Sequence, residues 1–571
     1  MTFDPDGVDA VDAVVVGSGP GGSTAADVLT AAGWSVLMFE RGRNHLVATE
    51  PPYDRLEHFS NDEVKFFSRH FLGPDPLVEP RTFRRTGSAE EREHVGEVND
   101  LPATVGGGGV HADGKLPRFR PADFQPVSAD GPMPDSALAD WPIGYDEMES
   151  FYCAAEAIVG VAGDNTGNPF APWRSKPFPM PPGAPMKGAL LASEAARDLG
   201  FHPYAAPTGV NSVDYDGRPP CRNCGHCAFY GCPIHAKGDP VAPLQKALRT
   251  GRLRLWAECF ASRVTTAGGR ATGVDYVDPT GRSRHVAARH VVLAGGAMES
   301  PRLALLSGIE HPALGAHLMF HFQTLVTGCM PVGTDMLGMR GRSVTHGQDD
   351  SVVCDAPARA AARAAGLPWI RGGFVEYASG GGPVLTAKEF PPGAQHRDLM
   401  RQQLLGSRLW ALCQQGEDMP LTSNRVDLDP GVRDARGIPV ARVTHAVHPH
   451  ELVASEHWRV RLTELLVRMG TEWQVAVTSP MPHAPYGHFI SPVSQSKHVM
   501  GTMRMGDDPS TSVTDRWGRL HALPNVLVAD ASPFVTSAGY GPTLTLVALA
   551  LRNAHALAGT SLPLPLVATA R

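Results

Sequence analysis

Residues 11–40 read VDAVVVGSGPGGSTAADVLTAAGWSVLMFE, and this stretch predicts the first unit of the fold. The apolar run at 11–16 is rich in β-branched residues, which is typical of a strand buried on both faces. Residues 23–32 favour a helix of small side chains, and residues 34–39 favour a second strand. A strand, a helix and a strand in this order predict a β–α–β unit with parallel strands.

Three glycines at G-x-G-x-x-G spacing, Gly17, Gly19 and Gly22, join the first strand to the helix. In this motif the first glycine permits a tight turn, and the second lets backbone N–H groups approach a pyrophosphate. The third lets the helix pack close to the strand. The positive end of the helix dipole then faces the phosphates, so the glycines indicate a phosphate-binding loop.

Glu40 lies at the tip of the second strand, where its carboxylate can accept both ribose hydroxyls of an adenosine. The same carboxylate would repel a ribose 2′-phosphate, which argues against NADP. The stretch therefore predicts a dinucleotide site and leaves both FAD and NAD open.

The composition is that of a globular protein with more than one domain. The chain of 571 residues is long enough for two sizeable cores, and its formal net charge of −7 gives no reason to expect nucleic acid or an anionic membrane as partner. The first ten residues lack the pattern of a signal peptide, and no apolar run of about 18 residues predicts a transmembrane anchor. Nine cysteines without an export signal favour reduced thiols and a cytoplasmic location.

Later segments add pieces to the dinucleotide unit. Residues 105–111 (VGGGGVH) form a glycine run that must lie against something flat or tight, and residues 291–297 (VVLAGGA) predict another apolar strand that ends in glycines. Residues 525–531 predict a strand that ends in an acid, and residues 543–557 predict an apolar helix. The dinucleotide fold therefore draws on both ends of the chain.

The middle of the chain predicts a separate, substrate-binding region. From residue 320 to residue 490 the pattern changes to longer amphipathic segments with interspersed prolines. Alternating apolar and polar residues at 424–430 and 438–443 are typical of half-buried strands, and residues 451–468 favour a helix. Residues 41–100, by contrast, are polar and show no clear period.

Several motifs together resemble the glucose–methanol–choline (GMC) family of flavin oxidoreductases, and the match spans nearly the whole chain. The motifs are the three glycines with Glu40, the loop 105–111, Trp141-Pro142 with Tyr145, and the segments 294–301, 498–506 and 530–543. The resemblance implies FAD rather than NAD, and oxidation of an alcohol to a carbonyl.

The resemblance also implies an α/β fold of two domains. The first is a Rossmann-like FAD-binding domain of the GMC and p-hydroxybenzoate hydroxylase type, assembled from residues 10–125, 205–320 and 497–565. The second is an α+β substrate-binding domain with an antiparallel sheet, assembled from residues 126–204 and 321–496.

The same resemblance implies which residues contact FAD. They are Gly17, Gly19, Gly22, Glu40, Gly107, Gly108, His111, Ala294, Asp530, Pro542 and Thr543. Residues 105–119 (VGGGGVHADGKLPRF) look most like pyranose oxidases and related sugar dehydrogenases. In some of those the histidine that matches His111 carries the flavin covalently, and many other relatives have a histidine here without that bond, so both arrangements remain open.

His498 is the expected catalytic base. Oxidation of an alcohol by a flavin needs a base for the hydroxyl proton, and a neutral imidazole suits that task near pH 7. The position of His498, just before the segment 502–506 (TMRMG), resembles that of the family's catalytic histidine. The N-terminus of the helix that begins at Thr543 could stabilise negative charge developing on the flavin.

The last motif departs from the family pattern at Gly541. The family usually has a second histidine or asparagine before the proline, whereas this chain reads YGPT at 540–543. Glycine has no side chain to hold the substrate oxygen, so another group must do so unless the substrate is unusual. The alternatives are a water, Tyr540, or one of three histidines of the substrate region: His321, His483 and His488.

Four cysteines form a C-x2-C-x2-C-x4-C pattern: Cys221, Cys224, Cys227 and Cys232. Four thiolates at this spacing can bind an iron–sulfur cluster or zinc. Some sugar dehydrogenases of the family carry a three-iron cluster in the corresponding region, with a different cysteine spacing. The alternative is a tight turn of reduced thiols without metal.

The function that these residues favour is FAD-dependent oxidation of an alcohol or sugar hydroxyl. The partners would be a small-molecule substrate and an electron acceptor, which could be oxygen, a quinone or a redox protein. Two alternatives remain. A flavin-dependent lyase or decarboxylase on the same fold would accommodate the missing side chain at Gly541, and a flavin and iron–sulfur electron-transfer subunit would give the cysteines the main role.

Overall fold

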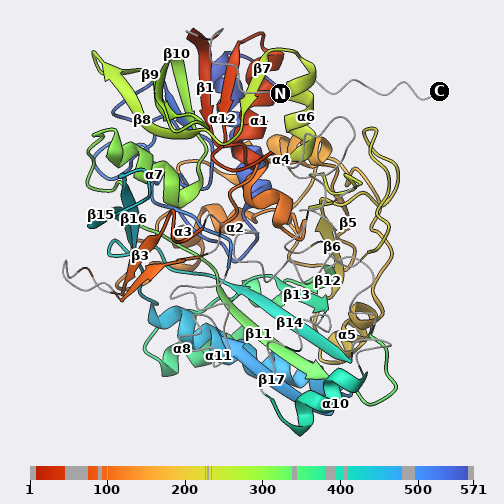
Figure 1. The fold of residues 1–571 in the computed structure, drawn as a ribbon. Helices are drawn as coiled ribbons and strands as arrows, with labels where there is room; N and C mark the ends of the chain where they lie inside the picture. The colour runs from red at the N-terminus through yellow and green to blue at the C-terminus, as the bar shows by residue number, and fades with distance from the viewer. Residues whose placement is uncertain are drawn as a thin grey trace.

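Three sheets and the helices that cover them make up the protein in its computed structural model (Figure 1). The first sheet lies at one end of the molecule, the second lies toward the opposite end, and the third lies at the side between them. The structure describes residues 8, 10–44, 75–85, 87, 93–99, 101–224, 227, 231–232, 234–238, 240–336, 344–379, 387, 392–402, 408–478 and 496–562.

The first sheet is a parallel sheet extended by an antiparallel meander. Its strands run in the order β7-β2-β1-β10-β9-β8, and β18 pairs with the carboxyl end of β10. The pairs formed by β1, β2, β7, β10 and β18 are parallel, which confirms the predicted β–α–β unit. The bounds are β1 (Ala10–Val16), β2 (Val36–Phe39), β7 (Leu253–Trp256), β8 (Phe260–Ala267), β9 (Arg270–Val277), β10 (Ser283–Leu293) and β18 (Val526–Val528).

The centre of β1 is buried on both faces, as its apolar run predicts. Ala13, Val14 and Val15 are fully buried. Ala13 and Val15 enter one hydrophobic core and Val14 enters another, because successive side chains of a strand point to opposite faces. The sheet therefore separates two cores.

Helices cover one face of this sheet and join the two ends of the chain. α1 packs against α12 and α6, and α12 packs against α4. α7 follows β10 directly and contacts β8 and the third sheet. The bounds are α1 (Pro20–Ala31), α4 (Tyr145–Val159), α6 (Val241–Arg249), α7 (Gly296–Leu306) and α12 (Thr543–Ala558).

The glycine loop lies in direct backbone contact with two distant segments. A Cβ added at Gly17, which has a φ of +105°, would lie 2.3 Å from the carbonyl oxygen of Ala294. A Cβ added at Gly21 would lie 1.6 Å from the carbonyl oxygen of Ala529. Only glycine allows these approaches, so the loop fixes the ends of β10 and β18 beside the start of α1.

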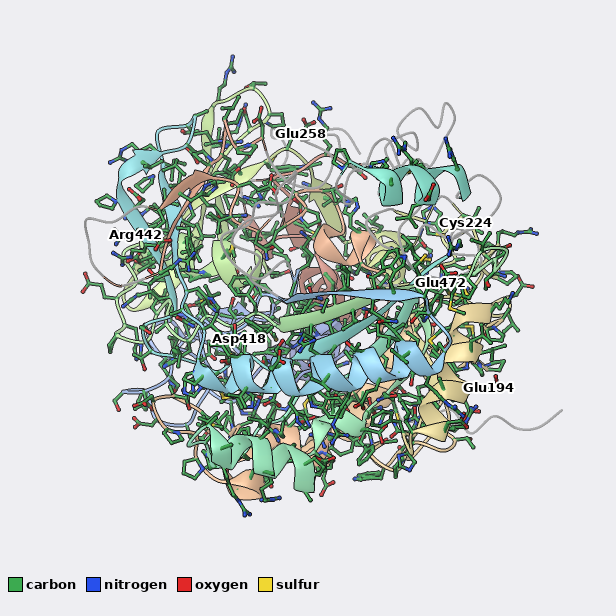
Figure 2. All side chains as sticks on the ribbon, turned by 90° about the horizontal axis from the view of Figure 1, so that it is seen from below. Glu194, Cys224, Glu258, Asp418, Arg442 and Glu472 are labelled. Carbon is green, nitrogen blue, oxygen red and sulfur yellow. The ribbon has the colours of Figure 1, made fainter. Side chains whose placement is uncertain are left out.

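The second sheet is antiparallel throughout, as expected for the substrate-binding region. Its order is β17-β11-β14-β13-β12-β6-β5. α11 packs across β11, β14 and β17, as Figure 2 shows from below, and α5 packs on β12 and β13. The bounds are β5 (Ala162–Asp164), β6 (Tyr204–Thr208), β11 (Phe322–Cys329), β12 (Val344–Gln348), β13 (Val375–Ser379), β14 (Leu409–Gly416), β17 (Trp473–Thr478), α5 (Lys187–Asp198), α8 (Ala356–Ala364), α10 (Ala394–Gln402) and α11 (Pro449–Arg468).

The longest of these helices, α11, carries charged side chains along its length. Within the described ranges, no helix combines the length and the apolar character that crossing a bilayer requires.

The third sheet contains strands that the sequence pattern does not reveal. Its order is β15-β16-β3-β4, with bounds β15 (Arg425–Arg433), β16 (Pro439–Thr444), β3 (Arg81–Arg84) and β4 (His94–Gly96). β3 and β4 come from the region 41–100, where no period is visible, because strands of four and three residues are too short to show one. The domain boundary expected at residue 205 falls inside β6.

Replacement of Gly21 by alanine is expected to destabilise the fold, because the new Cβ forces α1 away from Ala529. Overpacking of this kind costs about 1–3 kcal/mol of unfolding free energy. Gly19→Ala is the matched control, since nothing lies within 4 Å of its Cβ position and its φ of −64° suits alanine. Denaturant unfolding of both apoproteins measures the difference, and equal stability would contradict the close contact.

Candidate active site

A cavity of about 450 Å³ opens between the carboxyl ends of the first sheet's strands and the face of the second sheet. This is the edge at which sheets of this kind bind their ligands, and the volume is in the range of small-molecule sites. The cavity brings together eleven residues that the sequence predicts for the site. They are Gly17, Gly19, Glu40, Gly107, Gly108, His111, Ala294, His498, Asp530, Pro542 and Thr543.

The start of α1 forms one end of this cavity. Gly19 is the N-cap residue and no side chain caps the helix, so the first backbone N–H groups face the cavity without a side-chain acceptor. A Cβ at Gly19 would meet nothing within 4 Å, which shows open space beside the helix end. Gly22 does not line the cavity, but its missing side chain avoids a contact of 2.1 Å with the carbonyl oxygen of Gly17. The geometry fits a pyrophosphate.

Glu40 lies beside the phosphate end with its carboxylate already oriented. One oxygen, Oε2, accepts hydrogen bonds from the N–H of Ser18 at 3.2 Å and from its Oγ at 2.6 Å. The other, Oε1, accepts from the N–H of Gly42 at 2.9 Å. These bonds hold the carboxylate at the cavity wall, where it can receive ribose hydroxyls.

Asp530 and the start of α12 form the next part of the wall. Asp530 accepts hydrogen bonds from the N–H of Gly296 at 2.9 Å and from the N–H of Ser532 at 2.8 Å, and burial raises the pKa of its carboxyl. Pro542 is the N-cap of α12 and no side chain caps this helix, so its positive end faces the cavity beside Thr543. The N-terminal ends of α1 and α12, together with the carboxylates of Glu40 and Asp530, fit a dinucleotide. Such a dinucleotide would carry a ring system beyond Asp530, near the start of α12.

The glycine run 107–111 passes over the cavity as a short 3₁₀ helix. A Cβ at Gly107 would lie 3.1 Å from the Cα of Gly19, so the run lies close to the phosphate loop. The buried Lys237 holds the run by donating from Nζ to the carbonyl oxygen of Val110 at 2.8 Å and to that of Ala112. His111 is buried and lines the cavity.

A two-residue bridge places His498 opposite His321. Met319 and Met500 exchange backbone hydrogen bonds of 3.0 Å and 2.9 Å, so the two segments run antiparallel. His321 follows Met319 by two residues and His498 precedes Met500 by two, which puts both side chains on the same face of the pair. Their Nδ1 atoms are 2.8 Å apart, and the rings meet at 85°.

The hydrogen bonds of the pair determine where its protons lie. His321 Nε2 is 3.1 Å from the carbonyl oxygen of Ser537, which can only accept, so Nε2 carries the proton. In the neutral ring His321 Nδ1 is then an acceptor, and His498 Nδ1 must donate to it. His498 Nε2 is therefore unprotonated and available as a base. This assignment is inferred from the Ser537 and His498 contacts of His321, because the structure places the ring nitrogens and not their protons.

Burial keeps both imidazoles neutral. It lowers the pKa of His498 well below 6.5, and the neighbouring His321 and Lys115 lower it further. Burial also lowers the pKa of His321 to about 4. A neutral pair is what the N–H···N bond requires, so geometry and electrostatics agree.

Gly541 faces the catalytic candidate directly. A Cβ added there would lie 3.8 Å from His498 Nε2 and 3.7 Å from the backbone oxygen of Lys115. The missing side chain therefore leaves space beside the base. His321 contacts Nδ1 of His498, on the side of the ring away from Nε2, and so does not fill the space beside Gly541. His483 and His488 lie outside the described residues.

Tyr540 points away from this cavity, contrary to the sequence-based expectation. Its side chain is 1% exposed and lines a separate small cavity with Tyr204 and Asp349. Tyr540 is not among the residues that line the cavity of His498.

The described residues give no support to a metal site at the four cysteines. All four are described and none is in a disulfide, and Cys224 is exposed at the edge of the molecule (Figure 2). Within the described part of the chain, no group of three or more His, Cys, Asp or Glu side chains is placed to hold a metal ion. The prediction of an iron–sulfur cluster therefore finds no support.

A row of polar side chains, which the sequence pattern does not signal, forms the floor of the cavity near His498. Gln323 on β11 donates to Gln415 on β14 at 3.0 Å, and Gln415 donates to Glu376 on β13 at 2.7 Å. Glu376 forms an ion pair with Lys115, which also pairs with Asp113 at 3.0 Å. Adjacent strands of the second sheet thus present a polar surface to the cavity.

Comparison with known proteins agrees with this architecture. Two family models, each described as GMC oxidoreductase, match residues 186–323 and 420–550. Paromamine 6′-oxidase from Streptomyces fradiae is 30% identical over 96% of this chain and 91% of its own length. The chain belongs to the GMC oxidoreductase family. It is an enzyme of the class that acts on CH–OH donors.

Two further proteins show how far the likeness extends. 2-Methyl-1,2-propanediol dehydrogenase from Mycolicibacterium austroafricanum is 28% identical over 95% of this GMC chain and 94% of its own length. A solved structure of formate oxidase from Aspergillus oryzae RIB40 has a TM-score of 0.66 at 15% identity, over 97% of this chain and 98% of that one, and so shares the fold.

The lowered pKa of His498 predicts how oxidation by this GMC enzyme depends on pH. We expect the neutral imidazole of His498 to be the active form, and a lowered pKa means that this form persists into acid. The value of kcat/KM with an oxidisable alcohol is expected to stay constant as the pH falls from about 8 to about 5.5, where a histidine with an ordinary pKa near 6.5 would lose most of its basic form. A fall in kcat/KM centred near pH 6.5 would contradict the lowered pKa of His498.

Proposed function

We propose that the protein is an FAD-dependent enzyme that oxidises the hydroxyl of a small polar alcohol or sugar to a carbonyl, with His498 as the base. The observation that carries this proposal is the hydrogen-bonded pair of His498 and His321. It leaves an unprotonated Nε2 directed to open space beside Gly541. A base with no proton of its own, in a cavity that fits a dinucleotide, suits removal of a hydroxyl proton.

The residues of the cavity suit FAD from end to end. Glu40 would receive the ribose hydroxyls, the start of α1 the pyrophosphate, and Asp530 the polar chain beyond it. The positive end of α12 at Thr543 would face the pyrimidine edge of the ring, where it stabilises negative charge. When bound, FAD supplies the hydride acceptor at N5. Formate oxidase, which shares the fold, is a protein in which FAD modification occurs.

His498 does two things in this scheme. Its Nε2 accepts the hydroxyl proton, and its Nδ1–H stays on His321, which keeps the ring in the tautomer that presents the lone pair. His321 is buried and His498 is partly buried, so a substrate that fills the cavity would exclude water from the lone pair. His321 acts through His498 and is a positioning residue.

The polar floor favours a polar substrate. Gln323, Gln415 and Lys115 line the cavity, and each offers hydrogen-bond donors to hydroxyl groups. Two relatives are named for polar molecules, one for a propanediol and one for paromamine. A small molecule with more than one polar group fits these side chains better than a hydrocarbon alcohol.

His498→Ala is expected to abolish reduction of the bound flavin by alcohol, because general-base catalysis contributes roughly 10²–10⁴-fold to rate. Anaerobic stopped-flow mixing of the FAD-loaded variant with glycerol, glucose and 1,2-propanediol measures the loss of flavin absorbance. His285→Ala is the control, since His285 is an exposed histidine on the outer hairpin of the first sheet. Retention of most of the wild-type rate by His498→Ala would remove the proposed base.

A further inference from the structure

Lys115 is a buried cation beside the base. Its side chain is 11% exposed and lines the same cavity as His498. Nζ pairs with Asp113 at 3.0 Å and with Glu376. An ammonium group has three N–H donors. Among the described residues no partner takes the third donor, so it can bind a ligand in the cavity.

The charge on Lys115 is permanent. Burial alone would lower the pKa of its ammonium, but the carboxylates of Asp113 and Glu376 outweigh burial and raise the pKa above its ordinary value. Lys115 therefore stays protonated and cannot act as a base. It is a fixed positive charge, which suits stabilisation of a negative one.

The backbone places Lys115 next to the space that Gly541 leaves open. The carbonyl oxygen of Lys115 and the imidazole of His498 are the nearest groups to the missing Cβ, at 3.7 Å and 3.7–3.8 Å. Lys115 is held there by a bridge to Thr208 at the end of β6 and by the carbonyl of Pro207, which accepts from the following N–H at 2.9 Å.

Polar contacts link Lys115 to other residues near the same cavity, since Lys115 pairs with Glu376 and Glu376 accepts from Gln415. The positive charge of Lys115 acts on both histidines, since it lowers the pKa of His498 and of His321. From the other side, Gln415 hydrogen-bonds to Glu376 and lies within bonding range of His321. The base and the cation thus line one cavity, together with Gln323 and Gln415.

We propose that Lys115 supplies the group that Gly541 lacks: its ammonium binds the hydroxyl oxygen of the substrate and stabilises the negative charge that develops there as His498 takes the proton. The proposal deepens the proposed function and rests on it. The O–H bond breaks and its proton goes to His498 Nε2, the C–H bond breaks and its hydrogen leaves as hydride to the flavin, and the C–O bond becomes double. Lys115 keeps its protons throughout.

The test replaces Lys115 by methionine, which keeps the length and removes the charge. The FAD-loaded variant is mixed anaerobically with whichever of glycerol, glucose and 1,2-propanediol bleaches the wild type. Since loss of one such donor costs roughly 10²–10³ in rate, the limiting rate of flavin reduction should fall by about that factor. The alcohol concentration for half-maximal rate should change by less than about tenfold, because the interaction is made mainly in the transition state.

Rescue separates this role from a structural one. Gly541→Asn should raise the limiting rate of the Lys115→Met variant by about tenfold or more, because the new amide can donate to the same oxygen. The same change in the wild-type background should give no such gain. If Lys115→Met does not retain FAD, the pair Lys115→Met with Glu376→Gln takes its place, since it leaves no unpaired buried carboxylate.

Two results would overturn the proposal. One is a limiting rate of flavin reduction in Lys115→Met that lies within about threefold of the wild-type rate. The other is a change only in the alcohol concentration for half-maximal rate, which would mean that Lys115 binds the ground state and the transition state equally well. Failure of the proposed function itself would look different. In that case no alcohol bleaches the wild-type flavin, whatever the residue at position 115.

Discussion

Backbone contact at the glycine loop is the constraint on which the site depends. Gly17 lies against Ala294 and Gly21 against Ala529, at distances that no side chain permits. Short hydrogen bonds continue the contact, since Ala294 N–H donates to Val16 O at 2.8 Å and Ala529 N–H donates to Leu293 O at 2.7 Å. Segments from both ends of the chain therefore meet at one edge of the sheet, and the cavity exists only where they meet.

The chemistry arises where this edge faces the second sheet. His321 precedes β11 and His498 comes from the segment that returns to the first sheet, yet the bridge between Met319 and Met500 sets their rings together. Removing two imidazoles from water has a cost, which their shared hydrogen bond and the Ser537 carbonyl offset. The result is the proposed base, with the backbone carbonyl of Lys115 beside the same gap at Gly541 and the side chain of Lys115 lining the same cavity.

The sequence predicts those parts that local patterns encode. The β-branched run, the glycine spacing and the terminal Glu40 specify the first unit, and the motif after His498 indicates the base. The tautomer of His498 could not be predicted, because its partner lies 177 residues away and pairs through a bridge of two residues. The direction of Tyr540 and the charge on Lys115 depend in the same way on tertiary contacts. The cysteine spacing is compatible with a metal site or a metal-free turn, and the described residues give no support to the first.

Neutron diffraction from the FAD-loaded protein in deuterated solvent would test the central claim most directly, because it locates both the flavin and the protons of the histidine pair. The account predicts deuterium on His498 Nδ1, none on Nε2, and the isoalloxazine ring beside that Nε2. Deuterium on Nε2 with a bare Nδ1, or a flavin ring bound away from His498, would contradict it.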